Sequence, residues 1–448
     1  MANYLFLRGN RNKRFFSDIA AELIQKGNQC FLMKFELGEL LFKSEIETKY
    51  MPFYVSKKEY PITDQELLEM PLFNLTYKEY ILKKSVKKSE LRMYKRYLFA
   101  MDQYIKEKKI DAICTFNGYH WLDQMAQLLA RKYRLQMHYF EEGLFRPYTI
   151  THDLNGINAE ASIPRQPGFY QNIEVDQNRL NHYLFQPENP SLKETLGGQI
   201  LKVAFVKLVS MFGSLCRLNP KLYDHINFWQ ALNYFATKVV FKYKKEDTFE
   251  WPAEYVVLPF QMVGDTQILY NSPHIKTMER LLKRTVKAVT QINREEKRNI
   301  KIIVKEHPED ISRNNYSQLK RRYKDNGNVI FVKKFNVHSL IKNALAVITI
   351  NSTVGIEALA QHKRVITLGE ALYNIEGITW NCKHPSDLAN VLKTSLNEQV
   401  NHALIDKYLY YLRFHYQIEG TLNGCHPATS KNIAERLVAK VEREESIV

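Results

Sequence analysis

The sequence predicts an α/β protein in which two successive domains each contain a parallel sheet covered by helices. Short apolar runs alternate with longer segments of helical periodicity, which is the pattern of strand–helix–strand units. Two such series follow one another along the chain. A length of 448 residues and a hydrophobic content of 45% are sufficient for two separate cores.

The first series of strands and helices lies in the first third of the chain. Its buried apolar runs are predicted strands, and the periodic segments between them are predicted helices. The strands are residues 4–7, 30–35, 112–116 and 137–140, and the helices are residues 13–26 and 121–132.

The second series is more regular and predicts an independent doubly wound domain. Its strands are short and almost entirely apolar, as expected for strands that are covered on both faces. The strands are residues 255–260, 300–304, 329–332, 346–350 and 365–368, and the helices are residues 275–292, 312–323, 339–343 and 354–361.

The domain boundary is placed at Trp251, where an aromatic and basic segment ends and the second series begins. Residues 1–251 form the predicted N-terminal domain and residues 252–400 the C-terminal domain. Residues 401–448 read as helices, and one interpretation is that they pack back onto the first domain.

Charge and cysteine content restrict the classes of partner and the cellular compartment. A net charge of +16 predicts an anionic partner, which is a nucleic acid, an anionic membrane or a charged substrate. Five scattered cysteines predict reduced thiols, with no zinc site. We expect no secretory signal, and Lys202 and Lys207 interrupt the longest apolar stretch, so the protein should be cytosolic, soluble or peripheral.

Polar residues follow two strands of the second series, at the edge where parallel sheets bind ligands. Lys305, His307 and Pro308 come after one strand, and Ser352 and Thr353 come after another, where a helix begins. Cations, hydroxyl groups and a helix start all attract phosphate. Ser352 and Thr353 are also ordinary helix caps, which is the competing interpretation.

Carboxylates and amides follow other predicted strands. Glu141 and Glu142 follow residues 137–140, and adjacent carboxylates there suit a general acid or base, although a solvated acidic turn is equally compatible. Gln261 and Asp265 follow residues 255–260, and no packing role requires them. Glu357, one turn into its helix, is within reach of a ribose hydroxyl or is a surface carboxylate.

Several nucleotide-binding motifs are absent from the sequence. It contains no GxxxxGK[ST] loop and no GxGxxG fingerprint, which argues against an NTPase or a nicotinamide enzyme. It contains no DxD triplet, so a metal-bridged diphosphate is not expected. A donor with a single phosphate, held without metal or other cofactor, fits better.

Three short motifs together resemble those of a known family. These are EEG at 141–143, HP at 307–308 and ST at 352–353, within the longer segments FEEGLFRPYTIT, VKEHP and NSTVGIEALAQHKRVITLG; LPFQMVGDTQI lies between them. The set resembles the capsular polysaccharide biosynthesis family of retaining β-Kdo transferases, from about residue 116 to 380. A single transferase unit of this length is most similar to the type that adds the first Kdo.

The resemblance implies a GT-B glycosyltransferase, with two Rossmann-like domains and the active site in the cleft between them. It implies transfer of Kdo from CMP-Kdo to a (lyso)phosphatidylglycerol acceptor in the synthesis of a capsule linker. It also implies a cytoplasmic location, peripheral on the inner face of the cytoplasmic membrane of a Gram-negative bacterium. Partners would be the CMP-activated sugar, the anionic lipid, that membrane surface and other capsule synthesis proteins, but no nucleic acid.

The resemblance also implies roles for individual residues. Glu142 and Asp265 would be the catalytic pair, with Glu142 favoured as acid/base and Asp265 as nucleophile, although the roles can be exchanged. Nucleotide binding would fall to Lys305, His307, Pro308, Ser352, Thr353 and Glu357. Substrate binding would fall to Glu141, Arg146, Asn158 and Gln261, with Arg146 holding the Kdo carboxylate or, alternatively, pairing with Glu141.

Two basic runs suggest docking on an anionic membrane, or else are solvated helix faces. The first comprises Lys83, Lys84, Lys87, Lys88, Arg92, Lys95 and Arg96, and the second Lys202, Lys207, Arg217 and Lys221. Two other functions remain open. One is a transferase with another donor, such as CMP-sialic acid or a UDP-sugar, and the other is a basic membrane or nucleic-acid binding module.

Overall fold

The chain forms two compact units in the computed structural model. Unit 1 contains Met1–Ser162, Asp176–His225 and Leu412–Val448, and unit 2 contains Ile163–Val175 and Ile226–Tyr411. The division therefore falls before the predicted boundary at Trp251, and the predicted C-terminal segment is shared between the units. The structure describes residues 1–7, 14–41, 46–196, 200–216, 218–220, 237, 240–241, 243–310, 314–324, 326–422 and 426–445.

The sheet of unit 1 has seven strands in the order β13-β6-β5-β4-β1-β2-β3. The five adjacent strands from β5 through β4, β1 and β2 to β3 are parallel to one another. Strands β6 and β13 extend the β5 edge of the sheet with antiparallel pairing. The strands are β1 (Asn3–Leu7), β2 (Gln29–Lys34), β3 (Glu47–Tyr50), β4 (Ala112–Phe116), β5 (Gln136–Glu142), β6 (Thr149–Asp153) and β13 (Ile418–Glu419).

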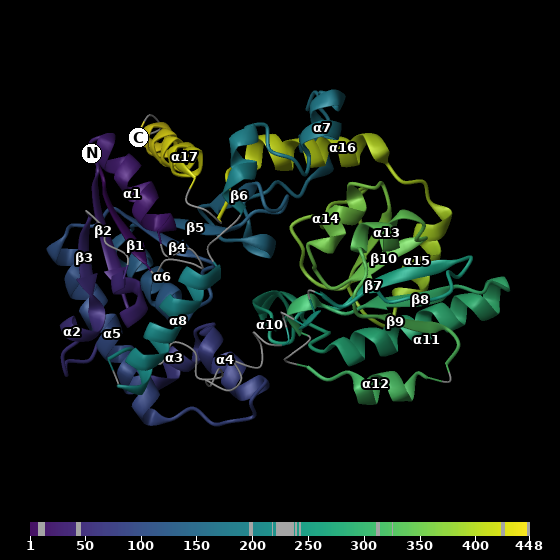
Figure 1. The fold of residues 1–448 in the computed structure, drawn as a ribbon, viewed down its shortest axis with the longest axis horizontal. Helices are drawn as coiled ribbons and strands as arrows, with labels where there is room; N and C mark the ends of the chain where they lie inside the picture. The colour runs from purple at the N-terminus through teal and green to yellow at the C-terminus, as the bar shows by residue number, and fades with distance from the viewer. Residues whose placement is uncertain are drawn as a thin grey trace. The chain divides into compact units, whose positions relative to one another are not determined.

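Helices cover both faces of this sheet because its strands are apolar on both sides. In β1, Tyr4 and Phe6 pack on one face against α1 (Phe15–Gln25) and α17 (Pro427–Glu445). Leu5 and Leu7 pack on the other face against α5 (Lys88–Glu107) and α6 (Trp121–Tyr133). Figure 1 shows α1 and α17 together beside β1 and β2. The other helices of unit 1 are η1 (Leu37–Leu41), α2 (Met51–Tyr54), α3 (Asp64–Glu69), α4 (Phe73–Tyr80), η2 (Asn158–Glu160), α7 (Gln177–Tyr183), η4 (Pro190–Leu196), α8 (Ile200–Leu215) and η6 (Leu412–Tyr416).

Unit 2 contains a fully parallel sheet of six strands in the order β12-β11-β10-β7-β8-β9. This is the doubly wound order, in which the connection changes direction between β7 and β10 and ligands bind beyond the strand ends. The strands are β7 (Tyr255–Pro259), β8 (Lys301–Lys305), β9 (Val329–Val332), β10 (Ala346–Thr349), β11 (Arg364–Thr367) and β12 (Trp380–Asn381).

The helices of unit 2 also lie on both faces of its sheet. Leu281 and Val289 of α11 (Met278–Glu296) and Leu392 of α15 (Leu388–Asn397) pack against Val256 and Leu258 on one face. Figure 1 shows α13 (Val337–Lys342) and α14 (Val354–Leu359) on the side of the sheet opposite α11 and α12 (Ser317–Arg322). The remaining elements are η3 (Pro167–Tyr170), α10 (Thr266–Asn271), η5 (Pro308–Asp310) and α16 (His402–Tyr411).

Every strand predicted from the sequence is present, and the two Rossmann-like sheets confirm the predicted α/β class. The strands that were not predicted are β3, β6, β12 and β13, which are short or polar and lie outside the central strands. The predicted helix 312–323 corresponds to the shorter α12, with residues 311–313 outside the described chain.

Candidate functional site

Two amides, the buried Gln261 and the half-buried Asn351, join β7 and β10 where the connectivity of the unit 2 sheet reverses. Gln261 follows β7, and its Nε2 donates to Oδ1 of Asn351 at 2.9 Å. Asn351 follows β10, and its backbone N–H donates to Oε1 of Gln261 at 3.2 Å. Gln261 was predicted as a substrate-binding residue, and here its amide fixes the ends of two strands relative to one another.

Asn351 also joins two further segments through its side-chain nitrogen. Nδ2 lies 3.0 Å from the carbonyl oxygen of Gln267, 3.1 Å from that of Glu370 and 3.3 Å from that of Asn271. One amide group thus connects β10 with α10 and with the loop after β11. Sequence reasoning named this asparagine within a motif but did not assign it a role. The available signal was an amide placed directly after a buried strand, next to Ser352.

The start of α14 holds the serine and threonine of the predicted phosphate site. The Ser352 hydroxyl accepts the N–H of Val354, the first residue of α14, at 3.2 Å. The Tyr373 hydroxyl donates to the Ser352 carbonyl oxygen. Gly355 permits this approach, since a Cβ there would collide with the Tyr373 ring. Thr353 is the N-cap residue of α14, and its side chain makes no capping hydrogen bond.

Lys305 lies at the end of β8, and its ammonium is directed toward the backbone. Nζ donates to the carbonyl oxygen of Glu306 at 2.8 Å and to that of Lys333 at 3.1 Å. The side chain is buried, and desolvation lowers the pKa of its ammonium group. An ammonium has three donors, so these two bonds leave capacity for one more acceptor.

The histidine of the predicted phosphate site is half-buried beside Pro308. Nδ1 of His307 accepts the N–H of Glu309 at 3.1 Å, which supports the single turn of η5. Glu306, between Lys305 and His307, is paired with Lys320 of α12. At this strand end, hydrogen bonds with backbone groups therefore hold both the ammonium group of Lys305 and the ring of His307.

Glu357 and Asp265, the two predicted acidic residues of unit 2, each have an identifiable partner. Oε2 of Glu357 lies 3.3 Å from Nε2 of His338 on α13, so the carboxylate bridges two neighbouring helices. Asp265 precedes α10, and its Oδ1 accepts the N–H of Gln267 at 2.9 Å. Because Gln267 in turn bonds Asn351, Asp265 belongs to the same connected group as Gln261.

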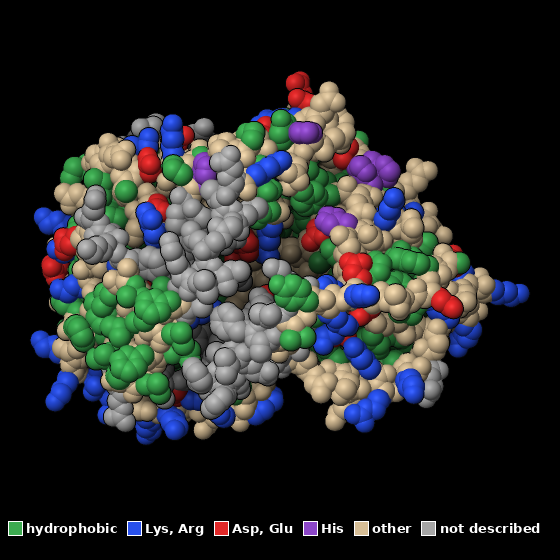
Figure 2. Space-filling model, in the orientation of Figure 1, with side chains coloured by type: hydrophobic (Ala, Val, Ile, Leu, Met, Phe, Trp, Pro, Cys, Tyr) green, Lys and Arg blue, Asp and Glu red, His purple; other side chains and the backbone are tan. Residues whose placement is uncertain are grey.

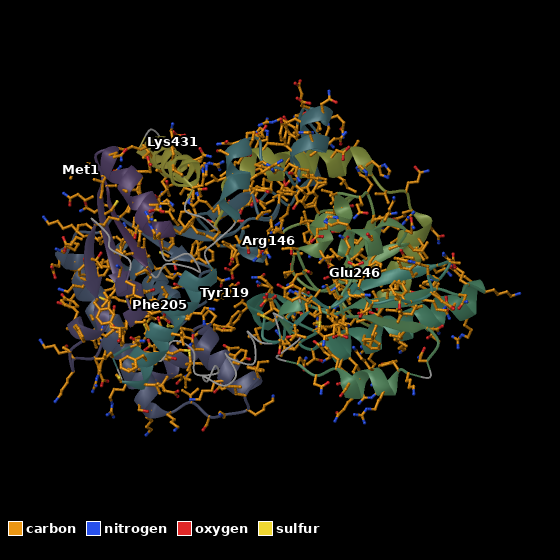
Figure 3. The ribbon with its side chains drawn as sticks, viewed as in Figure 1. Met1, Tyr119, Arg146, Phe205, Glu246 and Lys431 are labelled. Carbon is orange, nitrogen blue, oxygen red and sulfur yellow. The ribbon has the colours of Figure 1, made fainter. Side chains whose placement is uncertain are left out.

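In unit 1, the predicted carboxylates lie where β5 ends. Glu141 accepts from Nδ2 of Asn117 at 2.7 Å and from the N–H of Glu142 at 3.1 Å, while desolvation raises the pKa of its carboxyl group. Oε2 of Glu142 lies 3.6 Å from Nε of Arg146. Arg146, labelled in Figure 3, therefore pairs with Glu142 and not with Glu141, which corrects the alternative derived from the sequence.

Gly143 turns the chain between β5 and β6 beside these carboxylates. Its N–H donates to the Thr149 carbonyl oxygen at 2.8 Å, and a Cβ at this position would lie 2.1 Å from Thr149 Oγ1. Only glycine therefore allows the EEG segment to approach β6 so closely.

A buried aspartate organises the loop that carries Asn158. Asp153, at the end of β6, accepts from the backbone of Asn155 at 2.8 Å, from the hydroxyl of Ser162 at 2.7 Å and from that of Tyr416 at 2.8 Å. Asn158 begins η2 with a positive φ of 54°. Asp153 was not singled out from the sequence, because a polar TITHD segment gave no signal of a buried strand.

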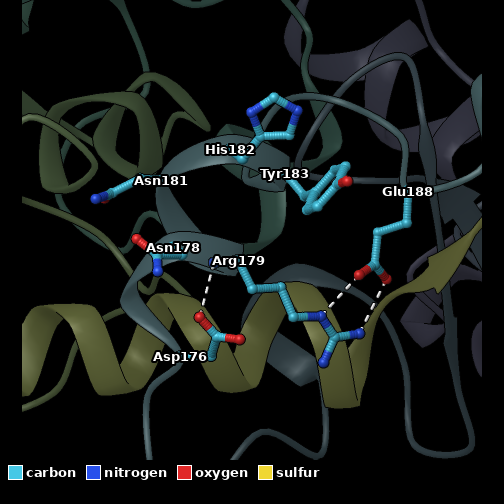
Figure 4. Close-up of a pocket in the computed structure, with 7 residues that line it drawn as sticks. All are labelled: Asp176, Asn178, Arg179, Asn181, His182, Tyr183 and Glu188. Carbon is cyan, nitrogen blue, oxygen red and sulfur yellow. Dashed lines mark hydrogen bonds and ion pairs between the residues drawn. The ribbon is translucent and has the colours of Figure 1, made fainter.

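A separate pocket lies on α7 of unit 1 and is shown in Figure 4. Its lining includes Asp176, His182 and the ion pair of Arg179 with Glu188, in which Nε and Oε1 are 2.7 Å apart. None of the residues that line it is a predicted site residue. Arg179 and Glu188 are occupied with each other and Asp176 caps α7, so the strand ends remain the candidate site.

Residues 111–421 match a model of the family described as "Capsule polysaccharide biosynthesis protein". The chain is 24% identical over 393 residues to "Capsule polysaccharide export protein KpsS" of Escherichia coli, covering 84% of this chain and 87% of that protein. It is 26% identical over 321 residues to "Capsule polysaccharide modification protein LipB" of Neisseria meningitidis serogroup B, covering 64% and 72%.

Among solved structures, the chain is similar to the Thermosulfurimonas dismutans KpsC beta Kdo 2,4 transferase. The two are 19% identical, with 85% of this chain and 97% of that chain covered and a TM-score of 0.39, which is too low to assign a function. The family match spans well over half of the 448 residues. The chain therefore belongs to the capsule polysaccharide biosynthesis protein family, as its motifs had indicated.

Proposed function

We propose that the protein is a retaining β-Kdo transferase of GT-B type that transfers Kdo from CMP-Kdo to a (lyso)phosphatidylglycerol acceptor. One observation carries the proposal: a chain of the capsule family places its EEG segment at the end of β5 and its HP and ST segments within three residues of the ends of β8 and β10. These are the ends at which parallel sheets bind ligands. We further propose that it acts on the cytoplasmic face of the inner membrane of a Gram-negative bacterium, together with other capsule synthesis proteins and without a metal or cofactor.

Ser352 and Lys305 have the donors that a leaving CMP phosphate requires. The Ser352 hydroxyl accepts from Val354, so its own proton remains available for a phosphate oxygen. Lys305 is desolvated, which strengthens its attraction for an anion that reaches it. With His307 beside Pro308 and with Thr353, these donors would stabilise the charge that develops on the phosphate in the transition state. Glu357 would contact the ribose if its bond to His338 opened.

Retention of configuration requires two displacements. In the first, one carboxylate attacks the anomeric carbon of Kdo while the bond to CMP breaks and CMP leaves with the electron pair. In the second, the acceptor hydroxyl loses its proton to the other acid/base group and displaces the carboxylate. We assign Asp265 as nucleophile and Glu142 as acid/base. The alternative assignment exchanges these two roles. Arg146 would hold the Kdo carboxylate, and Glu141, Asn158 and Gln261 would position the substrates.

The direct test is incubation of the purified protein with CMP-Kdo and lysophosphatidylglycerol, followed by mass spectrometry of the lipid. We expect a product larger by one Kdo or more. Glu142→Gln and Asp265→Asn should each lower turnover at least about 100-fold. Exposed acids in the two units, in Glu79→Gln and Glu376→Gln, are matched controls that should keep normal turnover. A folded protein that yields no product contradicts the proposal.

The donor can be identified separately by thermal shift. A ligand that binds only the folded state at about 100 times its Kd stabilises by about 2.7 kcal/mol. CMP should therefore raise the melting temperature, and UDP should not. A response to UDP alone would favour a transferase with a UDP-sugar, and a comparison of CMP-Kdo with CMP-sialic acid as substrate would distinguish the two CMP donors. If the protein is only a basic binding module, neither CMP nor UDP should raise its melting temperature. It should instead bind nucleic acid in a salt-sensitive manner.

A further inference from the structure

Helix α8 of unit 1 exposes a row of large apolar side chains to solvent. Phe205, Leu208, Phe212 and Leu215 are 59%, 52%, 60% and 82% exposed. Their spacing of three, four and three residues places them on one face of the helix. Side chains of this size are seldom left in water as a contiguous group unless they bind something.

The opposite face of α8 is fixed firmly to unit 1. Val206 and Ser210 are buried, and a Cβ on Gly38 of η1 would lie 2.3 Å from the Val206 carbonyl oxygen. The Ser210 carbonyl oxygen accepts from Asn219 Nδ2 at 2.6 Å, and Asn219 Oδ1 accepts the N–H of Leu37 at 2.9 Å. These contacts fix the orientation of α8 on unit 1, so the exposure of the apolar row does not result from a loosely attached helix.

Neighbouring elements extend the apolar row into a surface. Leu40 and Leu41 of η1, which packs on α8, are 43% and 46% exposed. Phe53 of α2 is 74% exposed and contacts the Tyr50 ring, whose hydroxyl donates to the Leu218 carbonyl oxygen just beyond α8. Figure 2 shows a hydrophobic patch, bordered by Lys and Arg, in the region where Figure 3 labels Phe205. We call these seven side chains the α8 surface.

The charges on and around the α8 surface are basic. Helix α8 contains Lys202 and Lys207 and no acidic residue. In the adjoining segment, Glu39 is buried on the N–H groups of Phe35 and Glu36, and the half-buried Glu36 accepts from the Ser210 hydroxyl of α8 at 3.3 Å. Arg217 and Lys221, the rest of this predicted basic run, lie outside the described residues.

Three of the seven residues of the other predicted basic run lie in ion pairs with acidic side chains. Nζ of Lys95 is 2.7 Å from Oδ1 of Asp64, and Arg92 and Arg96 lie 3.6 and 3.8 Å from Glu59. Helix α8 differs from that run in its row of large exposed apolar side chains beside the lysines.

We propose that the α8 surface docks unit 1 on an anionic lipid bilayer, with α8 lying flat in the headgroup region. At 16 residues, α8 is shorter than a spanning helix, and among the described residues no helix is long and apolar enough to cross a membrane. A helix with one apolar face and lysines but no acids is suited to that interface. A second copy of the chain fits less well, since two surfaces of like charge would face each other.

The proposal extends the proposed function, because a lipid acceptor lies in such a bilayer. It can nevertheless fail separately, since vesicle binding is measured without donor or turnover. A protein that does not bind vesicles but transfers normally to detergent-dispersed lysophosphatidylglycerol would contradict the docking proposal and support the transferase proposal. A protein that binds vesicles but transfers nothing would support docking and contradict the transferase proposal.

The test is co-sedimentation of the full chain with vesicles of phosphatidylglycerol and phosphatidylcholine, compared with vesicles of phosphatidylcholine alone. We expect binding to the first and little to the second. The double variant Phe205→Glu/Phe212→Glu should weaken binding at least about tenfold, since it removes two large apolar contacts. The control Ile24→Glu/Val240→Glu changes two exposed apolar residues elsewhere and should bind normally. Both variants should keep the melting temperature of the parent protein, because all four side chains are exposed.

Equal binding of the two double variants would overturn the proposal, as would failure of the parent chain to bind anionic vesicles. A dimer that only Phe205→Glu/Phe212→Glu dissociates, seen by light scattering without vesicle binding, would assign the α8 surface to a second copy. A second readout uses Cys216, which is exposed directly after α8, whereas Cys30, Cys114 and Cys382 are buried. In a Cys425→Ser background, a polarity-sensitive dye on Cys216 should shift to the blue with anionic vesicles; an unchanged spectrum contradicts docking through α8.

Discussion

The two units have the same central strand order but different chemistry at their strand ends. In each unit an asparagine follows the fourth strand of the series, Asn117 after β4 and Asn351 after β10. Asn117 donates one bond to Glu141, a carboxylate, whereas Asn351 joins Gln261 and three carbonyl groups in a neutral network. The comparison shows that one topology can present carboxylates at the strand ends of one unit and a neutral network of amides in the other.

The largest effect should come from the turn that positions the acids of unit 1. Gly143→Ala brings a Cβ within 2.1 Å of Thr149 Oγ1 and against the Thr149 backbone, so either β5 or β6 must move. We expect a loss of about 3–5 kcal/mol of unfolding free energy, measured by urea denaturation. Gly168→Ala is the control, since a Cβ there meets nothing within 4 Å. Equal stability of both variants would show that the turn tolerates a side chain.

The comparison of the two asparagines can be tested directly. Asn351→Ala removes the side-chain hydrogen bonds to Gln261 and to three carbonyl groups, and should cost about 2–4 kcal/mol of stability. Asn117→Ala removes one bond to Glu141 and should cost about 1 kcal/mol. Parallel denaturation curves are the measurement. Similar losses would mean that the unit 2 network is no more rigid than the strand ends of unit 1.

The desolvated carboxyl group of Glu141 in unit 1 predicts that the stability of the protein depends on pH. Desolvation raises the folded-state pKa of Glu141 above its ordinary value of 4.5, so folding disfavours the ionised form. The resulting destabilisation is absent below that ordinary value and appears as pH rises through the folded-state pKa. Glu141→Gln should therefore gain stability relative to the parent chain as pH increases across this window, whereas Glu79→Gln should not. Denaturation at several pH values measures the difference, and a constant difference would contradict the prediction.

The smallest effect on stability is expected from the ion pair at the end of β5. Arg146 is 52% exposed, and its Nε lies 3.6 Å from Glu142, so Arg146→Gln should change stability by less than about 0.5 kcal/mol. Under the proposed function the same change should raise the KM for CMP-Kdo. A large loss of stability would make Arg146 a structural residue and remove it from the candidate site.

The central strands were predictable because each is a short apolar run covered on both faces by helices. The edge strands were not, since β3 reads ETKY and β13 pairs only two residues with β6, from a distant part of the sequence. At the site, Ser352 and Glu142 could be recognised by their position near the end of a strand. The amide network of Asn351 and the pairing of Glu357 with His338 depend on backbone groups and side chains brought together by the fold, which no local pattern encodes.

The edge formed by β13 has a consequence for the order in which the protein is made. Unit 1 contains the first strands of the chain, yet its sheet is completed by Ile418–Glu419 and one of its faces is covered by α17. All residues of unit 2 precede these segments in the chain. During synthesis from the N-terminus, unit 2 can therefore finish folding first. The apolar face of α1 and β1 stays uncovered until α17 has been synthesised. A nascent chain stalled before α17 would be a natural substrate for chaperones.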